Sequence, residues 1–203
     1  MSTSCESSFA EAFRDPLAVA HLMNDFPHSW CIAGGWAIDL FVNRISRLHK
    51  DVDIAIWRND QLAIRTYLMN RDWTLQKAMN GQLLPWIDGE FLELPVHTIW
   101  CRNAHAQPNF IEILFNECNE QHFLFRRELS ITHSRENAIV KLESGLPLLA
   151  PEIVLLYKAK NASNQKNQSD FEVALPHLRL DQRTWLKTAL SKVHPEHEWI
   201  DKL

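Results

Sequence analysis

Two aspartates separated by one residue, Asp51 and Asp53, are the side chains whose spacing points most directly to chemistry in this 203-residue sequence. They lie in the run Asp51 to Trp57, whose alternation of acidic and apolar residues predicts a β-strand. Because strand side chains alternate between faces, both carboxylates should point to one side. Neighbouring anions repel each other, and a divalent cation between them removes that repulsion. Oxygen ligands favour Mg²⁺ or Mn²⁺ over zinc.

A third carboxylate, Glu112, is the only acid in the otherwise apolar run Phe110 to Phe115. An acid among core residues needs a partner. We expect Glu112 to be either a third metal ligand or the base that accepts a proton from an acceptor hydroxyl. The alternatives are a buried acid with a structural partner, or an edge-strand residue. Glu93, in another alternating run, is the rival candidate for the base.

Two adjacent glycines, Gly34 and Gly35, follow the apolar run Trp30 to Ala33 and precede a segment with helical character, Trp36 to Phe41. This order predicts a strand, a tight turn and a helix. Glycines let the backbone approach a ligand closely, and a helix N-terminus presents free N–H groups to phosphate. We therefore expect the glycine turn to bind the phosphates of a nucleotide.

A basic stretch lies between the glycine turn and the paired aspartates. Its Arg44 and Arg47 are candidates to hold phosphate oxygens, with ordinary surface charge as the alternative. Asp39 is expected to pair with one of these arginines. His49 is expected to orient neighbouring groups rather than to bind metal directly.

The order of the predicted helices and strands that must position these groups indicates an α+β fold with a mixed sheet and flanking helices. Periodicity and turn residues predict a first helix that Pro16 divides or kinks, and a second helix capped by Asn59 or Asp60. The predicted helices cover residues 6–26 and about 60–70, and the predicted strands cover residues 30–33, 51–57, 74–79, 82–87, 91–101 and 110–115.

From Pro151 onward the pattern becomes helical, and Pro151 suits a first helical position. Lys158 falls in a nearly all-apolar helix, so its cation should have an anionic partner, unless the stem carries the amine into water. A polar run over residues 161–169 predicts a loop before a helix beginning at Asp170, and residues 185–193 carry the apolar stripe of a last helix. We place a boundary near Gly145.

These residues resemble the nucleotidyltransferases of the DNA polymerase beta superfamily, which show an apolar strand, a glycine turn, a short helix and Asp-x-Asp. The closer resemblance is to the branch that holds aminoglycoside 2″-adenylyltransferases and lincosamide nucleotidyltransferases. The motifs that carry it are Gly-Gly-Trp-Ala-Ile-Asp (34–39), Arg-Ile-Ser-Arg-Leu-His (44–49) and Asp-Val-Asp (51–53), continued by Ala150 to Lys160. Asn43 and Asn167 depart from the branch, which has Gly and Asp at these positions.

The resemblance implies a nucleotidyltransferase core over residues 1–145 and a C-terminal helical lobe over residues 146–203. It implies two Mg²⁺ ions, or Mn²⁺, held by Asp51, Asp53 and Glu112. It also implies that a further set of residues binds the nucleotide. The residues concerned are Gly34, Gly35, Trp36 (chiefly as a core residue), Arg44, Arg47 and Lys158, the last as a ligand of the triphosphate. The implied reaction moves AMP from ATP, or from another nucleotide triphosphate, onto a hydroxyl of a small acceptor such as an aminoglycoside or lincosamide, releasing pyrophosphate.

Composition narrows the partners further. The formal net charge is −4, which disfavours long nucleic acids because nonspecific polyanion binding needs many clustered cations. No window reaches the apolar length of a membrane-spanning helix and the first residues do not resemble a signal peptide, so we expect a cytoplasmic protein without a membrane partner. The alternatives to antibiotic modification are a toxin-type nucleotidyltransferase acting on protein or tRNA, and a noncatalytic nucleotide binder.

Overall fold

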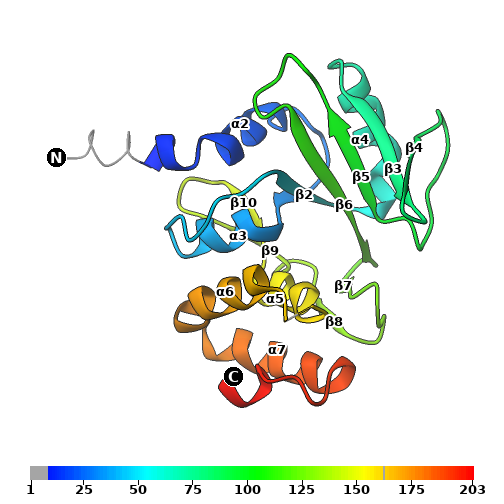
Figure 1. The fold of residues 1–203 in the computed structure, drawn as a ribbon. Coiled ribbons are helices and arrows are strands. Elements are labelled where there is room, and N and C mark those ends of the chain that lie inside the picture. The colour runs from blue at the N-terminus through cyan, green and yellow to red at the C-terminus, as the bar shows by residue number, and fades with distance from the viewer. Residues whose placement is uncertain (1–8, 162) are drawn as a thin grey trace.

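The computed structural model describes residues 9–161 and 163–203, and its centre is a mixed β-sheet (Figure 1). The main path of the sheet has the order β4-β3-β5-β6-β2-β1-β10-β9, and β7 and β8 extend it from the end of β6. Helices lie beside this sheet, and a group of helices forms the C-terminal end of the chain. The predicted α+β class, with a mixed sheet, flanking helices and a helical C-terminal part, is confirmed.

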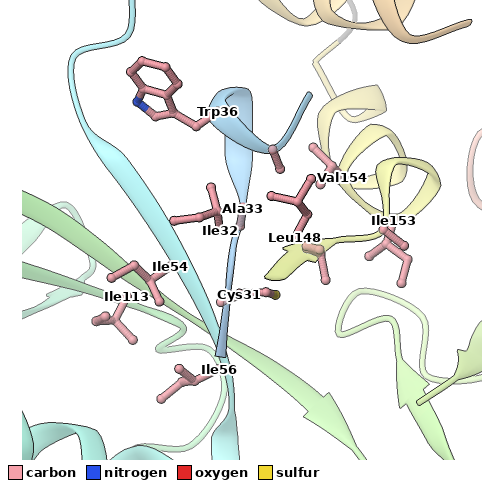
Figure 2. Close-up of a cluster of buried hydrophobic side chains, with 14 of the residues drawn as sticks. Cys31, Ile32, Ala33, Trp36, Ile54, Ile56, Ile113, Leu148, Ile153 and Val154 are labelled. Atoms are coloured by element: carbon pink, nitrogen blue, oxygen red, sulfur yellow. The ribbon is translucent and has the colours of Figure 1, made fainter. Parts of the chain in front are cut away.

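The glycine turn connects two central strands. Strand β1 (Trp30–Ile32) leads directly into helix α3 (Gly34–Phe41), and β2 (Val52–Trp57) returns antiparallel to β1. Figure 2 shows the apolar residues of β1, β2 and β6 packed together, with Leu148, Ile153 and Val154 from the C-terminal side. Ile32 and Ile54 are fully buried there. This packing fixes the turn against the first residues of β2.

Strand β6 (Phe110–Cys118) runs parallel to β2, and β5 (Thr98–Arg102) runs antiparallel to β6 on its other side. Strands β3 (Thr74–Met79) and β4 (Gln82–Pro85) form a hairpin that completes this half of the sheet. A short 3₁₀ turn, η1 (Arg58–Asp60), leads from β2 into helix α4 (Gln61–Met69), whose buried Ile64 and Leu68 face the core. Asp60 occupies the predicted cap position, but its carboxylate pairs with His28 instead of capping the helix.

The C-terminal helices stack below the β1 and β10 side of the sheet (Figure 1). Helix α5 (Pro151–Ala159) has Pro151 at its first turn, as predicted, and buries most of its surface. Helices α6 (Gln165–Ala174) and α7 (Leu180–Val193) follow, joined by the 3₁₀ turn η2 (Leu175–His177), and the chain ends with η3 (Ile200–Lys202).

Several predicted boundaries were wrong for local reasons. Residues 91–97, predicted as the first half of a strand, form a loop. The Arg58 guanidinium donates hydrogen bonds to the carbonyl oxygens of Leu92 and Val96, at 2.9 and 2.8 Å, so these oxygens are not available to a neighbouring strand. Helix α6 begins inside the predicted loop 161–169, because the Asn164 side chain caps its first turn by accepting a hydrogen bond from the Lys166 N–H.

The N-terminal helix is divided, as predicted. Residues 9–12 are helical, and a separate helix, α2 (Arg14–Leu22), begins just before Pro16. A proline lacks the N–H that would continue the hydrogen bonding of the preceding turn, which explains the division. Residues 6–8 of the predicted helix lie outside the described residues.

Four strands of three residues each were not predicted. Three-residue strands are too short for alternation to be recognised. Strand β10 lies just past the boundary predicted at residue 145, yet it pairs parallel with β1. The division into residues 1–145 and 146–203 stays a prediction. The strands are β7 (His122–Leu124), β8 (Thr132–Ser134), β9 (Ile139–Lys141) and β10 (Pro147–Leu149).

Candidate active site

The three candidate carboxylates lie near the start of β2 and near the start of the neighbouring strand β6. Asp53 and Glu112 are direct partners in the parallel β2–β6 register, and Asp51 precedes Asp53 by two residues. Directly paired residues in adjacent strands point to the same face. The sequence therefore predicted correctly that Asp53 and Glu112 lie on neighbouring strands, and the fold makes them immediate neighbours.

Electrostatics show that these acids act on one another. Burial, and next the charge of Asp51, raises the pKa of Asp53 to about 6. Burial, followed by the charges of Asp53 and Asp51, raises the pKa of Glu112 to about 7. None of the three carboxylates has a hydrogen bond or ion pair from another residue in the described ranges. The charges of Lys158 and Arg47 lower the pKa of Asp53 in part, but neither cation forms an ion pair with these carboxylates.

The glycine turn lies directly against this charge. The N–H of Ala33 donates to the main-chain oxygen of Asp53 at 2.8 Å. A Cβ atom added to Gly34 would lie 1.7 Å from Asp53 Oδ2, and Gly34 has a positive φ of 60°. Both the close approach and the left-handed backbone require glycine here. The first N–H groups of α3 thus begin beside the acids, which is the geometry that phosphate binding needs.

Gly35 makes a second close approach, to the basic stretch. A Cβ atom there would lie 2.1 Å from Arg47 Nη2 and 2.7 Å from His49 Cε1. The His49 ring stacks on Trp36 with centroids 4.3 Å apart, and Trp36 is buried, as expected for a core residue. The loop between α3 and β2 is therefore folded back onto the glycine turn.

Asp39 anchors that loop, and its expected pairing with an arginine was wrong. Its fully buried carboxylate accepts hydrogen bonds from the main chain and hydroxyl of Ser46, and lies 2.7 Å from His49 Nε2. His49 therefore helps to hold this loop in place, and its role in orienting groups at the site stays a prediction. Arg44, the other expected partner, is exposed.

Arg47 and Lys158 share a different acid, Asp170 of α6, which sequence reasoning did not select. Arg47 donates to both carboxylate oxygens, at 2.8 and 3.0 Å, and Lys158 Nζ lies 2.7 Å from Oδ2. The Asp170 side chain is fully buried. Burial by itself would raise the pKa of Asp170, but its hydrogen bonds and charge interactions with the two cations lower that pKa below its ordinary value. Lys158 has the anionic partner that its apolar helix required, and the cluster joins the basic loop to the helical lobe.

Both departures from the family pattern have structural explanations. Asn43 follows the end of α3 with a positive φ of 53°, a conformation that favours Gly and, next, Asn. The Asn167 amide donates to the carbonyl oxygens of Lys158 and Asn161, at 3.1 and 2.9 Å. An aspartate could not donate these bonds. Neither substitution alters the carboxylates at the β2–β6 register.

A cavity of about 320 Å³ opens beside Gly34, between the sheet and α5. Its wall brings together Lys158 and two residues that the sequence analysis missed, Arg126 and Arg127. The adjacent pair of arginines was the available signal, but nothing in the sequence placed it opposite the glycine turn. Tyr157 also lines the cavity and donates to Asn116 at 3.1 Å, while Arg127 donates to the Tyr157 carbonyl oxygen.

Two other features lie elsewhere. Glu93, the rival base, is exposed in the loop after β4, and its charge is not among those that shift the pKa of Asp53 or Glu112. A larger hollow of about 1020 Å³ is lined by Trp30 and Trp57. Trp30 begins β1 and Trp57 ends β2, so this hollow lies at the opposite end of these strands from the acids.

The carboxylates Asp51, Asp53 and Glu112 have the chemistry of a divalent-cation site. Across residues 9–161 and 163–203, no three His, Cys, Asp or Glu side chains are already gathered closely enough to hold a metal ion. The donor set at Asp51, Asp53 and Glu112 consists only of carboxylate oxygens, the kind that Mg²⁺ prefers. Burial and the neighbouring negative charges raise the pKa values of Asp53 and Glu112, and a cation would offset both effects. The residues therefore fit a cation that draws them together.

The fold of this chain is similar to the folds of solved antibiotic-resistance proteins. The solution structure of the antibiotic-resistance factor ANT(2″)-Ia is similar over 93% of this chain and 94% of that one, with a TM-score of 0.56 and 13% identity. A crystal structure of ANT(2″)-Ia in complex with adenylyl-2″-tobramycin has a TM-score of 0.58 and 12% sequence identity, over 92% of this chain and 99% of that one. The lincomycin-bound lincosamide adenylyltransferase LnuA gives 0.56 and 12% identity over 79% and 94%.

The sequence itself points to a narrower group. Residues 16–97 match the model of the aminoglycoside-2″-adenylyltransferase family. The predicted resemblance to the aminoglycoside and lincosamide branch is thereby confirmed. No curated protein matches the sequence significantly. In the described part of the chain, no helix has the length and apolar character needed to cross a membrane.

Proposed function

We propose that this protein transfers AMP from ATP to a hydroxyl of an aminoglycoside or lincosamide antibiotic, with Mg²⁺, in the cytoplasm. The observation that carries the proposal is the register of Asp53 against Glu112, with Gly34 against the Asp53 carboxylate. The structural neighbours bear on the acceptor, since one is in complex with adenylyl-2″-tobramycin and another is bound to lincomycin.

Asp51, Asp53 and Glu112 would hold Mg²⁺. When bound, the metal supplies positive charge that neutralises the phosphates and the leaving pyrophosphate. The carboxylates fix where that charge lies, at the open end of β2 next to the glycine turn. Mn²⁺ has similar oxygen-ligand chemistry and should substitute.

The chain's own cations would hold the triphosphate. Gly34, at the start of α3, and Lys158 both line the cavity. Arg126 and Arg127 add two guanidinium groups to its wall. Arg47 lies behind Gly35 and is held by Asp170, so its role would be to orient the basic loop and to contribute positive charge.

Glu112 is the best-placed base. Its pKa of about 7 suits a group that must accept a proton near neutral pH. It lies on β6 beside Asp53, whereas the charge of the rival Glu93 is not among the causes that shift the pKa of either group. Deprotonated Glu112 would take the proton of the acceptor hydroxyl as that oxygen attacks the α-phosphorus of ATP. The bond from the α-phosphorus to the bridging oxygen breaks, and its electron pair leaves with pyrophosphate.

The test is incubation with Mg²⁺, ATP labelled at the α-phosphate, and separately tobramycin and lincomycin. We expect labelled acceptor and pyrophosphate from the wild type, and neither from Asp53→Asn. The Glu93→Gln variant is the matched control and should stay active. Absence of an adduct with every acceptor and of pyrophosphate release would contradict the proposal. Label on protein or tRNA instead would favour the toxin-type alternative.

A further inference from the structure

A row of side chains crosses the sheet from the candidate site toward its far edge. In the β5–β6 register Trp100 is paired with Glu112, and in the β3–β5 register Gln76 is paired with Trp100. Directly paired residues point to one face, so Asp53, Glu112, Trp100 and Gln76 share a face in that order. Trp100 is therefore the aromatic side chain that stands next to the proposed base.

Trp100 is held in a built cluster. Its ring meets Phe110 edge to face, with centroids 5.2 Å apart. The Arg102 guanidinium lies 5.0 Å from the centroids of both rings, and its Nη1 donates to Gln76 Oε1 at 3.2 Å. Trp100 and Phe110 are nevertheless only partly buried. A fixed, half-exposed aromatic pair beside a reactive group is suited to bind the apolar face of a small molecule.

The charge of this face favours one kind of acceptor. On the described strands β3 to β6, Glu112 is the only carboxylate on this face. The other polar or aromatic members there are Thr74, Gln76, Thr98, Trp100, Arg102, Phe110 and Asn116. Arg102 adds a permanent positive charge at the Trp100 cluster. Asp51, Asp53 and Glu112 are the acids that a metal would neutralise. An acceptor with several ammonium groups would thus meet a cation without a free acid to pair with it.

We propose that Trp100, with Phe110 and Arg102, forms the acceptor platform, and that it selects an amphiphilic amino-sugar with little positive charge, of the lincosamide kind, over polycationic aminoglycosides. This inference rests on the proposed function, because it assigns the acceptor of the same site. Trp100 is a specificity-determining residue that contacts the acceptor. Its loss weakens acceptor binding and leaves ATP binding intact.

The experiment is calorimetric titration of the protein with lincomycin, tobramycin and Mg²⁺-ATP, together with KM and kcat for any acceptor that is modified. We expect lincomycin to bind more tightly than tobramycin. Trp100→Ala should weaken lincomycin binding about tenfold, the loss expected for one aromatic contact. Trp100→Phe should restore most of it, and Arg102→Glu should shift preference toward tobramycin. Trp185→Ala, which changes a half-buried tryptophan of α7, is the matched control and should leave lincomycin binding unchanged.

Failure of this inference is distinguishable from failure of the proposed function. Tighter binding of tobramycin, no binding of lincomycin, or unchanged lincomycin affinity in both Trp100 variants would overturn the inference even if AMP is transferred. Lincomycin binding that depends on Trp100, without AMP transfer to any acceptor, would uphold the platform and contradict the enzymatic proposal. Thermal unfolding of each variant separates a binding loss from a folding loss.

Discussion

Replacing Asp53 by asparagine should stabilise the metal-free protein while abolishing activity. Burial and the charge of Asp51 raise the Asp53 pKa from 3.8 to about 6, so the ionised carboxylate is unfavourable in the folded state. An acid whose pKa is higher in the folded than in the unfolded state adds to the free energy of unfolding while it is protonated. That contribution is complete below the unfolded-state pKa and is lost as the pH rises through the folded-state pKa. Near pH 8 that loss corresponds to about 3 kcal/mol.

Asparagine removes this loss because it stays neutral. At about pH 8 in chelator, Asp53→Asn should therefore unfold at a temperature about 5–10 °C higher than the wild type, as expected for a chain of this size. At about pH 4 the two proteins should unfold at similar temperatures. Addition of Mg²⁺ should raise the wild-type unfolding temperature and leave the variant nearly unchanged, because the cation compensates a charge that only the wild type carries.

The assay is thermal unfolding followed by circular dichroism across that pH range, with Glu93→Gln as a control for the loss of an exposed acid. An Asp53→Asn variant that is less stable than the wild type near pH 8 would refute the reasoning. So would a stability difference independent of pH, since the argument depends on ionisation of this one carboxylate.

Three further predictions concern the surroundings of that carboxylate. Gly34→Ala should lose activity at least about a hundredfold, whereas Gly89→Ala, which has the same positive φ sign but open space around its Cβ position, should lose little; a comparable loss in both would show that backbone strain, not crowding, matters. Asp170→Asn should destabilise the protein by about 2–3 kcal/mol and raise KM for ATP, because it leaves two cations without their buried partner; chemical denaturation and kinetics would measure both effects, and unchanged stability would argue against the cluster. Glu112→Gln should lower kcat and flatten the rise of kcat with pH through about 7, and a pH profile that keeps its wild-type shape would contradict its role as the base.

The sequence was sufficient to select the carboxylates and the glycine turn of the candidate site, because the motifs that contain them are local. A glycine pair at a helix start and two acids with the period of a strand need few residues to be recognised. Glu112 was found because a lone acid in an apolar strand is conspicuous, and its register with Asp53 followed once β2 and β6 were adjacent.

The remainder depends on contacts between distant segments. Asp170 lies 123 positions after Arg47 and directly follows the polar run predicted as a loop, so nothing local marks it as the shared partner of Arg47 and Lys158. Arg126 and Arg127 face the glycine turn only because α5 folds against the sheet. Residues 91–97 were wrongly predicted as part of a strand. Buried Arg58 donates hydrogen bonds to two carbonyl oxygens of this loop, a tertiary contact that the alternation of residue types in the sequence cannot show.

Binding of Mn²⁺-ATP, followed by the electron paramagnetic resonance of free Mn²⁺, tests the central claim most directly. That claim is that Asp51, Asp53 and the Gly34 turn together hold a metal-bound triphosphate. We predict that the wild type removes Mn²⁺ from solution when ATP is present, and that Asp51→Asn, Asp53→Asn and Gly34→Ala each abolish this uptake while Glu93→Gln does not. Uptake by the Asp51→Asn and Asp53→Asn variants equal to that of the wild type, or no ATP-dependent uptake by the wild type, would contradict the account.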